Sequence, residues 1–201
     1  MKNYFHPHYV DCLFKIFVRR FWTIVNYISA RYWRVSIGTN VRFNGKTYFN
    51  ILPGGHVSIG SRCSFNSSPC SNLIGVYSPC IISTQSAKAS IQIGNACGFS
   101  GTVIASALSV TIGDNVRCGA NTLIMDTDWH TDDCRAGKDA AVVIEDNVWL
   151  GYGVKIMKGV RIGENSLIGA CSVVTHNIPK NCVAAGNPCR VVRYLEDSVY
   201  K

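Results

Sequence analysis

Apolar residues recur at every sixth position along the segment from 144 to 178, with polar residues and turns between them. The positions on this phase are all aliphatic: Ile144, Leu150, Ile156, Ile162, Ile168 and Val174. A second phase, four residues further on, carries small or β-branched side chains at most positions: Val148, Val154, Val160, Ser166, Ser172 and Ile178. A strict repeat of this length is typical of a parallel β-helix, in which three hexads form one triangular coil.

The repeat also predicts which residues stack on one another. One hexad cannot bury its own apolar side chain, so the coils depend on their neighbours for a continuous core. With 18 residues in each coil, the expected pairs are Ile144 with Ile162, Leu150 with Ile168, and Ile156 with Val174. We therefore predict an all-β chain built mainly as one column of coils.

The same spacing continues toward the N-terminus in a weaker form. We expect further hexads on Ile37 and Phe43, Ile59 and Phe65, Ile93, Phe99 and Ala105, and Ile112, Cys118 and Ile124. The pattern leaves the register of residues 66–90 open, although it favours a strand within 76–84. Twenty residues instead of six separate Ile124 from Ile144, which predicts one protruding loop at about 126–140. Insertions of this kind often carry the binding function of a repeat protein.

Residues 9–33 contain no proline or glycine, and their large apolar residues recur at spacings of three and four, which predicts a helix. Lys15, Arg19 and Arg20 interrupt the apolar run well before the roughly 20 residues that a membrane span requires. Two placements remain open: a cap on the end of the β-helix or on a neighbouring subunit, and a helix lying in a membrane interface. We divide the chain into a helical segment 1–34, a β-helix 35–193 and a tail 194–201, and expect a short closing helix within 191–201.

Composition narrows the class of protein. Charged residues make up 16% and apolar residues 47% of the 201-residue chain, which favours one well-packed domain. The net charge is +8, and a basic patch suits a membrane surface or an anionic cofactor, since no nucleic-acid motif is present. The ten cysteines include no CxxC pair, and Cys63, Cys97 and Cys118 fall on repeat phases. We interpret them as small buried side chains in a reducing cytoplasm, and we expect no metal site.

The predicted loop carries the chemistry. His130 lies among Asp126, Asp128, Asp132 and Asp133. Histidine is suited to accept and return a proton near neutral pH, and a neighbouring carboxylate can orient the imidazole ring. From these residues alone, a catalytic base and an incidental histidine in a solvated acidic loop both remain open.

The sequence SVVTHNIPKNCVAAGNPCRVVR at 172–193 resembles the closing segment of the galactoside, maltose and capsule-sugar O-acetyltransferases, which are hexapeptide-repeat acyltransferases. The run DTDWH at 126–130, which precedes VVIEDNVWLG at 142–151, is also similar to theirs. The resemblance implies a left-handed β-helix, a homotrimer with active sites between subunits, and His130 as the general base. His130 would deprotonate an acceptor hydroxyl that attacks acetyl-CoA, and would then protonate the leaving thiolate.

Asp128 or Asp126 could orient His130 or bind an acceptor hydroxyl, and Trp129 could stack on a sugar ring, but all three could equally be ordinary loop residues. Asn121 is a weaker candidate for binding the acceptor. The resemblance also implies a coenzyme A site. The positions that match the coenzyme A contacts of the family are Tyr152, Ala170, Thr175, His176, Arg190 and Arg193. Two of them depart from the family pattern, because Tyr152 replaces a small residue and His176 replaces lysine.

The expected function is therefore acetyl-CoA-dependent O-acetylation of a sugar hydroxyl in surface-polysaccharide synthesis, in the cytoplasm or on the inner face of the membrane, with peripheral membrane contact through residues 9–33. N-acetylation of an amino sugar and a non-catalytic trimeric scaffold remain alternatives. A γ-type carbonic anhydrase would require three histidine ligands for zinc, and of the histidines only His130 lies in the predicted loop.

Overall fold

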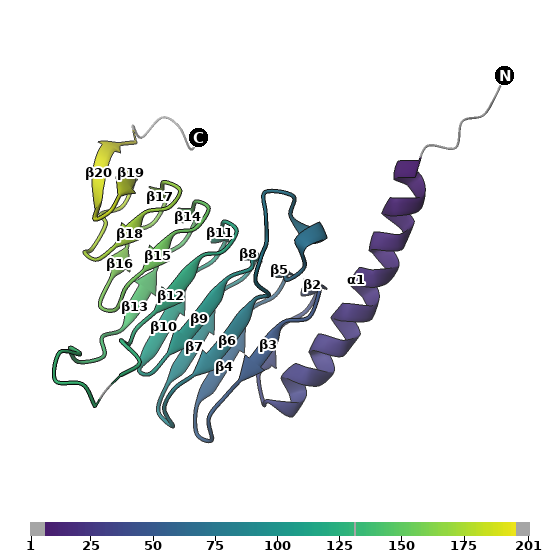
Figure 1. Ribbon diagram of the computed structural model, residues 1–201, viewed down its shortest axis with the longest axis horizontal. Coiled ribbons are helices and arrows are strands. Elements are labelled where there is room, and N and C mark those ends of the chain that lie inside the picture. The colour runs from purple at the N-terminus through teal and green to yellow at the C-terminus, as the bar shows by residue number, and fades with distance from the viewer. Residues whose placement is uncertain (1–6, 131, 196–201) are drawn as a thin grey trace.

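The computed structural model describes residues 7–130 and 132–195 and shows a three-sided stack of coils with one helix across its N-terminal end (Figure 1). Three sheets run along the stack, and each coil contributes one strand to each sheet. All strand pairs are parallel except the last, β19 with β20. The predicted all-β architecture, a parallel β-helix preceded by an α-helix, is confirmed.

The strands are short, from two to six residues, as expected for a chain that turns a corner after every hexad. Sheet A contains β1 Ser36–Ile37, β4 His56–Ile59, β7 Ser90–Ile93, β10 Ser109–Ile112, β13 Val142–Ile144 and β16 Arg161–Ile162. Sheet B contains β2 Arg42–Asn44, β5 Ser64–Asn66, β8 Gly98–Ser100, β11 Arg117–Cys118, β14 Trp149–Leu150, β17 Leu167–Ile168, β19 Cys182–Gly186 and β20 Cys189–Tyr194. Sheet C contains β3 Tyr48–Asn50, β6 Ile81–Thr84, β9 Val103–Ser106, β12 Leu123–Met125, β15 Lys155–Ile156 and β18 Val173–Val174.

The core is a column of inward-facing aliphatic and aromatic side chains. Each stacking pair predicted from the repeat is present: Ile144 with Ile162, Leu150 with Ile168, and Ile156 with Val174. All six of these side chains are fully buried. Burying one such side chain contributes about 1.5–3 kcal/mol, so the stack gains stability with every coil added.

The N-terminal coils fill the same column with larger side chains. Phe43, Phe65 and Phe99 stack with their ring centroids 5.0 and 4.9 Å apart. In the third coil the residue paired with Ile124 is Ile104, whereas the hexad spacing predicted Ala105. The prediction fails by one residue because this coil reaches sheet C after five residues rather than six; Ala105 instead pairs with Met125.

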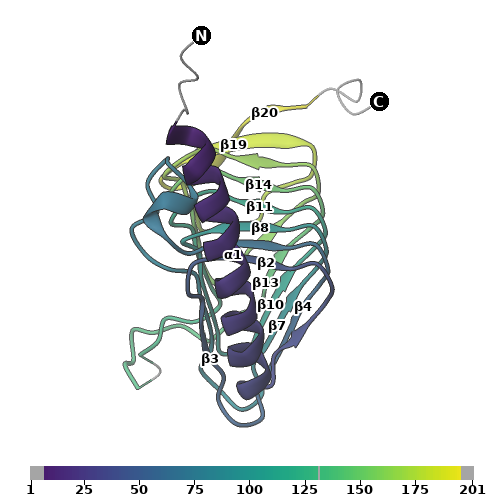
Figure 2. The same ribbon diagram turned by 90° about the vertical axis from the view of Figure 1, so that its right-hand side faces the viewer.

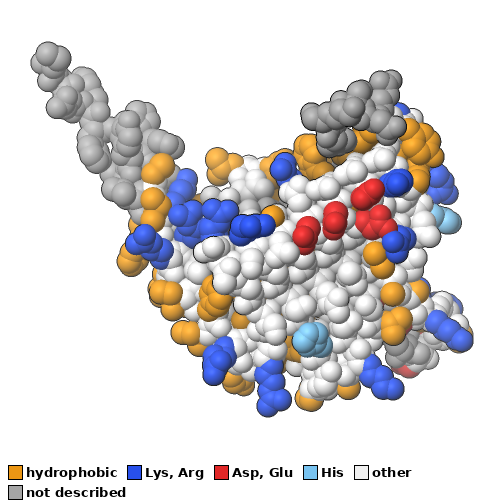
Figure 3. All heavy atoms as spheres, turned by 180° about the vertical axis from the view of Figure 1, so that it is seen from behind, with side chains coloured by type: hydrophobic (Ala, Val, Ile, Leu, Met, Phe, Trp, Pro, Cys, Tyr) orange, Lys and Arg blue, Asp and Glu red, His pale blue; other side chains and the backbone are white. Residues whose placement is uncertain are grey.

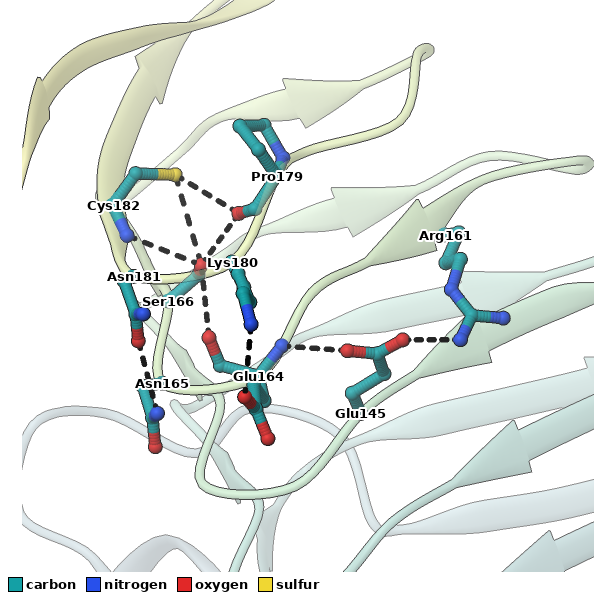
Figure 4. Close-up of polar contacts among 9 residues, drawn as sticks. All are labelled: Glu145, Arg161, Glu164, Asn165, Ser166, Pro179, Lys180, Asn181 and Cys182. Carbon is teal, nitrogen blue, oxygen red and sulfur yellow. Dashed lines mark hydrogen bonds and ion pairs between the residues drawn. The ribbon is translucent and has the colours of Figure 1, made fainter.

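The corner between sheets A and B is held by polar side chains from successive coils (Figure 4). Asn147, Asn165 and Asn181 all have positive φ angles, of 58°, 59° and 54°, which asparagine adopts more readily than most residues. The Asn165 side-chain amide donates to Asn181 Oδ1 at 2.9 Å, and the Glu164 backbone N–H donates to Glu145 Oε2 at 2.9 Å. These bonds satisfy turn groups that the hexad pattern leaves without sheet partners.

The helix α1, Pro7–Tyr32, covers the open N-terminal end of the stack, as Figure 2 shows. Asn26 is buried and bridges to the first coil, donating to Gly45 O at 3.0 Å and accepting from Thr47 N at 2.9 Å. The Tyr27 hydroxyl donates to Gly38 O at 3.1 Å. The predicted helix is confirmed, and its contacts place it as a cap on the first coil, which is one of the two placements left open by the sequence. Within the described part of the chain, no helix is both long and apolar enough to cross a membrane.

Two arms leave the stack, where the sequence predicted one (Figures 1 and 2). The first, the 67–80 arm, connects β5 to β6 and contains the short 3₁₀ helix η1, Pro69–Ser71. The second is the predicted loop, the 126–140 arm, which connects β12 to β13. The 67–80 arm lies at the corner where the chain passes from sheet B to sheet C, and the 126–140 arm lies at the corner where it passes from sheet C to sheet A. The two arms therefore leave opposite ends of the sheet C strands, and we call these two corners the edges of sheet C.

The C-terminal end differs from the expected closing helix. Residues 189–194 form β20, which folds back antiparallel on β19 and ends sheet B. The antiparallel pairing of β20 with β19 supplies hydrogen bonds to the backbone of Cys189–Tyr194. A helix at this position would lose these bonds between strands. Residues 196–201, the rest of the predicted helix, lie outside the described residues.

Candidate active site

The base of the 126–140 arm is fixed by one buried carboxylate. Asp126 has no exposed surface, and its oxygens accept hydrogen bonds from Ser106 Oγ at 2.7 Å, Ala107 N at 2.6 Å and Leu108 N at 2.9 Å. Ala140 N donates to Asp126 O at 3.0 Å, which brings the two ends of the arm together. The buried carboxylate oxygens bind these three donors and are not exposed to a sugar hydroxyl. The structure therefore gives Asp126 a structural role in place of the expected substrate contact.

A second acidic residue holds the arm against the next coil. Lys158 Nζ donates to Asp128 Oδ2 at 2.5 Å and to Gly137 O at 2.8 Å, and Gly137 N donates to Asp128 Oδ2 at 3.2 Å. The Lys158 ammonium group holds the pKa of the Asp128 carboxyl below its usual range. In the described structure Asp128 therefore contacts Lys158 and Gly137, and not the His130 imidazole that it was expected to assist.

His130 lies at the exposed part of the same arm. Its backbone N–H donates to Asp128 O at 2.9 Å, and its carbonyl accepts from Asp133 N at 3.1 Å, so the main chain on both sides is turned back on itself. No described side chain hydrogen bonds to the imidazole, which leaves both ring nitrogens accessible. This combination of a fixed backbone and an unengaged ring suits a group that exchanges protons with a bound molecule.

Trp129 has a strained backbone next to His130. Its φ angle is 69°, in the left-handed region that a bulky residue rarely adopts, and its side chain is 54% exposed. Trp129 N donates to Thr127 Oγ1 at 3.2 Å, and Thr127 is buried, which helps to hold this conformation. Strain of this kind costs about 1–3 kcal/mol and is found preferentially at functional sites.

Asn121 supports the other arm. Its side-chain amide donates to Gly75 O at 2.6 Å and its Oδ1 accepts from Tyr77 N at 3.2 Å, so both ends of the amide bind the 67–80 arm. Asn121 is also buried and has a φ angle of 62°. In this structure the buried Asn121 side chain bonds the 67–80 arm through both its nitrogen and its oxygen, and its contact with the acceptor stays a prediction.

Two of the expected coenzyme A residues lie at the corner between sheets B and C. Tyr152 and Ala170 each follow the inward residue of β14 and β17 by two positions, so they stack in successive coils. A Cβ on Gly151 would lie 2.7 Å from Ala170 N, so this corner is too tight for a side chain there. Arg190 and Arg193 are exposed on β20, which also contacts β18. Arg190 and Arg193 thus offer two exposed cations, and Ala170 is exposed at the corner.

The other two expected coenzyme A residues lie at the corner between sheets C and A. His176 follows the inward residue of β18 by two positions, as Lys158 does in β15 and Asp126 in β12. The Thr175 hydroxyl and His176 Nδ1 are 2.9 Å apart, and both residues are exposed. His176 and Lys158 are therefore neighbours in the column from which the 126–140 arm leaves.

The site residues thus form two groups on one copy of the chain, one at each edge of sheet C. His130, Lys158, Thr175 and His176 belong to the edge shared with sheet A. Tyr152, Ala170 and the 67–80 arm belong to the edge shared with sheet B. From Tyr152 to Lys158 is six residues, which span at most about 20 Å of extended chain. Among the described residues, no three His, Cys, Asp or Glu side chains are placed to hold a metal ion.

Sequence reasoning missed the second arm and its anchor. Residues 67–80 read as irregular and polar, and nothing in their composition indicated that they project from the stack. One signal was available: an asparagine directly after a hexad corner, as at Asn121, is suited to a positive φ angle and to bonding a neighbouring turn.

Residues 141–176 match the family described as bacterial transferase hexapeptide (six repeats). A galactoside O-acetyltransferase of Lactococcus lactis subsp. lactis (strain IL1403) is 48% identical over 97 residues, which cover 46% of this chain and 46% of that protein. The chain therefore spans about half the length of the curated relatives it matches.

Solved structures are similar as well. A hexapeptide-repeat acetyltransferase of Vibrio cholerae O1 biovar eltor, in complex with acetyl coenzyme A, is 30% identical, with 58% of this chain and 66% of that chain covered at a TM-score of 0.50. A variant of an N-acyltransferase of Bacillus cereus, in complex with dTDP-4-amino-4,6-dideoxyglucose and coenzyme A, covers 80% of this chain and 84% of its own at a TM-score of 0.62. At 20% identity the latter shows the fold alone, that of the left-handed parallel β-helix.

Proposed function

We propose that this chain, which belongs to the hexapeptide-repeat acyltransferase family, transfers an acetyl group from acetyl-CoA to a hydroxyl group of a sugar. The observation that carries the proposal is the exposed imidazole of His130, held on an arm whose base is fixed by Asp126 and whose flank is fixed by Asp128 and Lys158. An arm anchored at its base and along its flank can hold an unengaged imidazole ring in place beside a bound acceptor.

His130 is the proposed base. A ring nitrogen accepts the proton of the acceptor hydroxyl as the hydroxyl oxygen attacks the thioester carbonyl. The carbon–sulfur bond then breaks, and the imidazolium returns the proton to the departing thiolate. The chain needs no nucleophile of its own, and a base of this kind contributes about 10²- to 10⁴-fold to the rate.

Acetyl-CoA is the proposed donor because exposed cations and polar groups follow the expected path. Arg190 and Arg193 on β20 suit the phosphates, since guanidinium groups bind phosphate in a fixed fork geometry. The Thr175 hydroxyl bonds His176 Nδ1 and so fixes that ring for a further phosphate or amide contact. Tyr152 and Ala170 would border the pantetheine arm, and the exposed Trp129 would stack on a sugar ring.

We also propose that the working enzyme is a homotrimer. The two groups of site residues lie at opposite edges of sheet C, so no single copy brings His130 beside Tyr152 and Ala170. A three-fold ring would place the His130 edge of one copy against the Ala170 edge of the next. The acceptor we propose is a sugar of a surface polysaccharide, in keeping with the resemblance of the DTDWH run to the capsule-sugar enzymes.

The function is tested by thiol release from acetyl-CoA with a panel of sugars, comparing the unmodified chain with His130→Ala. We expect kcat to fall by about 10²- to 10⁴-fold in the variant. Asp132→Asn, an exposed change on the same arm, is the matched control and should retain the full rate. Equal rates for His130→Ala and the control would remove His130 as the base. Mild alkali distinguishes the products, because it cleaves an O-acetyl ester and leaves an N-acetyl amide intact.

The shared site is tested by mixing two inactive variants. His130→Ala damages one edge of sheet C and Ala170→Glu the other, so a mixed trimer contains some interfaces with both edges intact. We expect co-expression of the two variants to restore a substantial part of the activity. No recovery, with trimers confirmed by sedimentation, would place the whole site on one copy.

A further inference from the structure

The helix α1 has an unpartnered apolar face. Phe14, Phe17, Phe21, Ile24 and Ile28 are between 52% and 69% exposed. Their spacing of three and four residues places all five on one side of the helix, and we call this set the α1 stripe. The stripe is not needed for capping, because Asn26, Tyr27 and Ala30 on another side of the helix make the contacts with the first coils.

Arginines border the α1 stripe on the side of the helix that carries Tyr27. A groove between α1 and the first two coils is lined by Arg19, Arg20, Arg42 and Arg62, together with Ile24 of the stripe. A second groove, further along the same side of the helix, is lined by Arg31 and Arg34 together with Ile28, and Tyr27 lines both grooves. None of these six arginines has a carboxylate within salt-bridge distance among the residues that the structure describes.

The positive charge of the whole chain is also concentrated in its N-terminal half, which contains α1. Residues 1–113 contain ten Lys and Arg residues and one acidic residue, a net charge of +9, and residues 114–201 contain ten against eleven, a net charge of −1. Figure 3 shows the consequence, with a group of blue side chains next to the helix and the red side chains further along the stack. The positive potential is therefore concentrated at the end of the molecule where the apolar stripe is exposed.

We propose that α1 and the first two coils form a docking surface for a membrane that contains anionic phospholipid. The aromatic and aliphatic side chains of the α1 stripe would enter the boundary between headgroups and acyl chains. The arginines beside the stripe would lie level with the headgroups and bind lipid phosphate. Ile24 and Ile28 line the grooves as well as the stripe, so the apolar and cationic parts form one continuous surface.

A second copy of this chain fits the same surface less well. Pairing two stripes would bring together two sets of six arginines that have no carboxylate partners, and like charges at this distance repel. An anionic lipid surface supplies the opposite charge to every one of them. Charge complementarity therefore selects the membrane, and self-association becomes one outcome of the test.

The test is flotation of the full chain with vesicles of phosphatidylcholine alone, and with vesicles that contain 30% phosphatidylglycerol, at 0.1 M and 0.5 M salt. We expect binding to the anionic vesicles at low salt, and a weaker association at high salt. Arg20→Gln combined with Arg42→Gln should lower the partition coefficient about 30-fold, since each cation near an anionic surface contributes roughly a factor of five. Lys88→Gln, an exposed cation outside both grooves, is the control.

The apolar part is tested by Phe14→Ser combined with Phe17→Ser, for which we expect a loss of binding on the order of 100-fold. Leu108→Ser, another exposed apolar side chain, is the control and should bind normally. Circular dichroism and thiol release in the absence of vesicles establish that each variant is folded. Equal binding to neutral and anionic vesicles, no binding to either, or a change in oligomeric state with the Phe variants and no vesicle association would each overturn the proposal.

Discussion

The two arms begin at opposite edges of the same sheet, and a different kind of side chain holds each one. The 67–80 arm is held by the neutral amide of Asn121, with one donated and one accepted bond. The 126–140 arm is held by the buried carboxylate of Asp126, which accepts three bonds from the turn between β9 and β10. Hydrogen bonds to a charged group contribute about 1.5–3 kcal/mol each, and neutral ones about 1 kcal/mol.

The arm with the stronger hydrogen bonds at its base is also the arm whose residues need the more accurate positioning. The 126–140 arm positions His130, whose proposed role as a base depends on accurate placement, because an error of about 1 Å can reduce a rate 10²-fold. The 67–80 arm exposes Leu73, Ile74 and Tyr77, which are suited to packing against another surface and tolerate small shifts. Among the described residues Asp126 is the one fully buried aspartate, and we infer that the fold uses it where positional accuracy has the largest consequence.

Among the changes that test this difference between the two arms, Asp126→Ala should have the largest effect on stability. The change leaves the Ser106 hydroxyl and the Ala107 and Leu108 N–H groups without their acceptor, and we expect a destabilisation of about 3–5 kcal/mol in urea unfolding. Amide hydrogen exchange should increase along 126–140 and remain unchanged along 67–80. Ser106→Ala removes one of the three bonds to the carboxylate, and should cost about 1.5–3 kcal/mol. Normal protection of the 126–140 arm in Asp126→Ala would show that the carboxylate is not its anchor.

A smaller effect is expected from Asn121→Ala, which removes both amide bonds and places alanine at a φ angle of 62°. Together these cost about 2–3 kcal/mol. Asn121→Gly separates the two contributions, because glycine adopts this angle freely and loses only the bonds. We expect hydrogen exchange in the 67–80 arm to increase in both variants, with Asn121→Gly the more stable of the two in urea. Equal stability would mean that the backbone angle contributes nothing.

The same comparison shows how far sequence predicts this structure. The 126–140 arm was predictable because it interrupts a regular repeat: Ile124 on β12 and Ile144 on β13 are successive inward positions, although twenty residues separate them. The 67–80 arm was not, since the coils around it vary in length and provide no regular repeat to interrupt. The stacking pairs were predictable from the regular hexads, because each inward residue has one neighbour in the coil above it and one in the coil below it.

The roles of individual polar residues were harder to predict. Asp126 lies four residues before His130, which suggested chemistry, but its partners are the hydroxyl and N–H groups of residues 106–108, on a turn of the preceding coil. Asp128 likewise bonds Lys158, thirty residues away. Hexad periodicity predicts which residues point inward, but it does not predict which turn donors meet a given carboxylate. The β20 strand was misjudged for a related reason, because its pairing with β19 supplies the hydrogen bonds that local sequence attributed to a helix.

The smallest effect concerns the bond that holds the 126–140 arm to the next coil, between Asp128 and Lys158. The pKa of Asp128 is lowered in the folded chain, so the pair contributes stability above the unfolded pKa of an aspartate, about 3.9, and this contribution is lost as the pH falls through the lower folded value. The Asp128 side chain is 36% exposed, and solvent screening limits the contribution to less than about 1 kcal/mol. Asp128→Asn should therefore be slightly less stable than the unmodified chain at pH 7, with the difference vanishing near pH 2 and shrinking in 0.5 M salt. Urea unfolding of both chains between pH 7 and pH 2 measures this, and a difference that stays constant across the range would mean that the ion pair does not stabilise the arm.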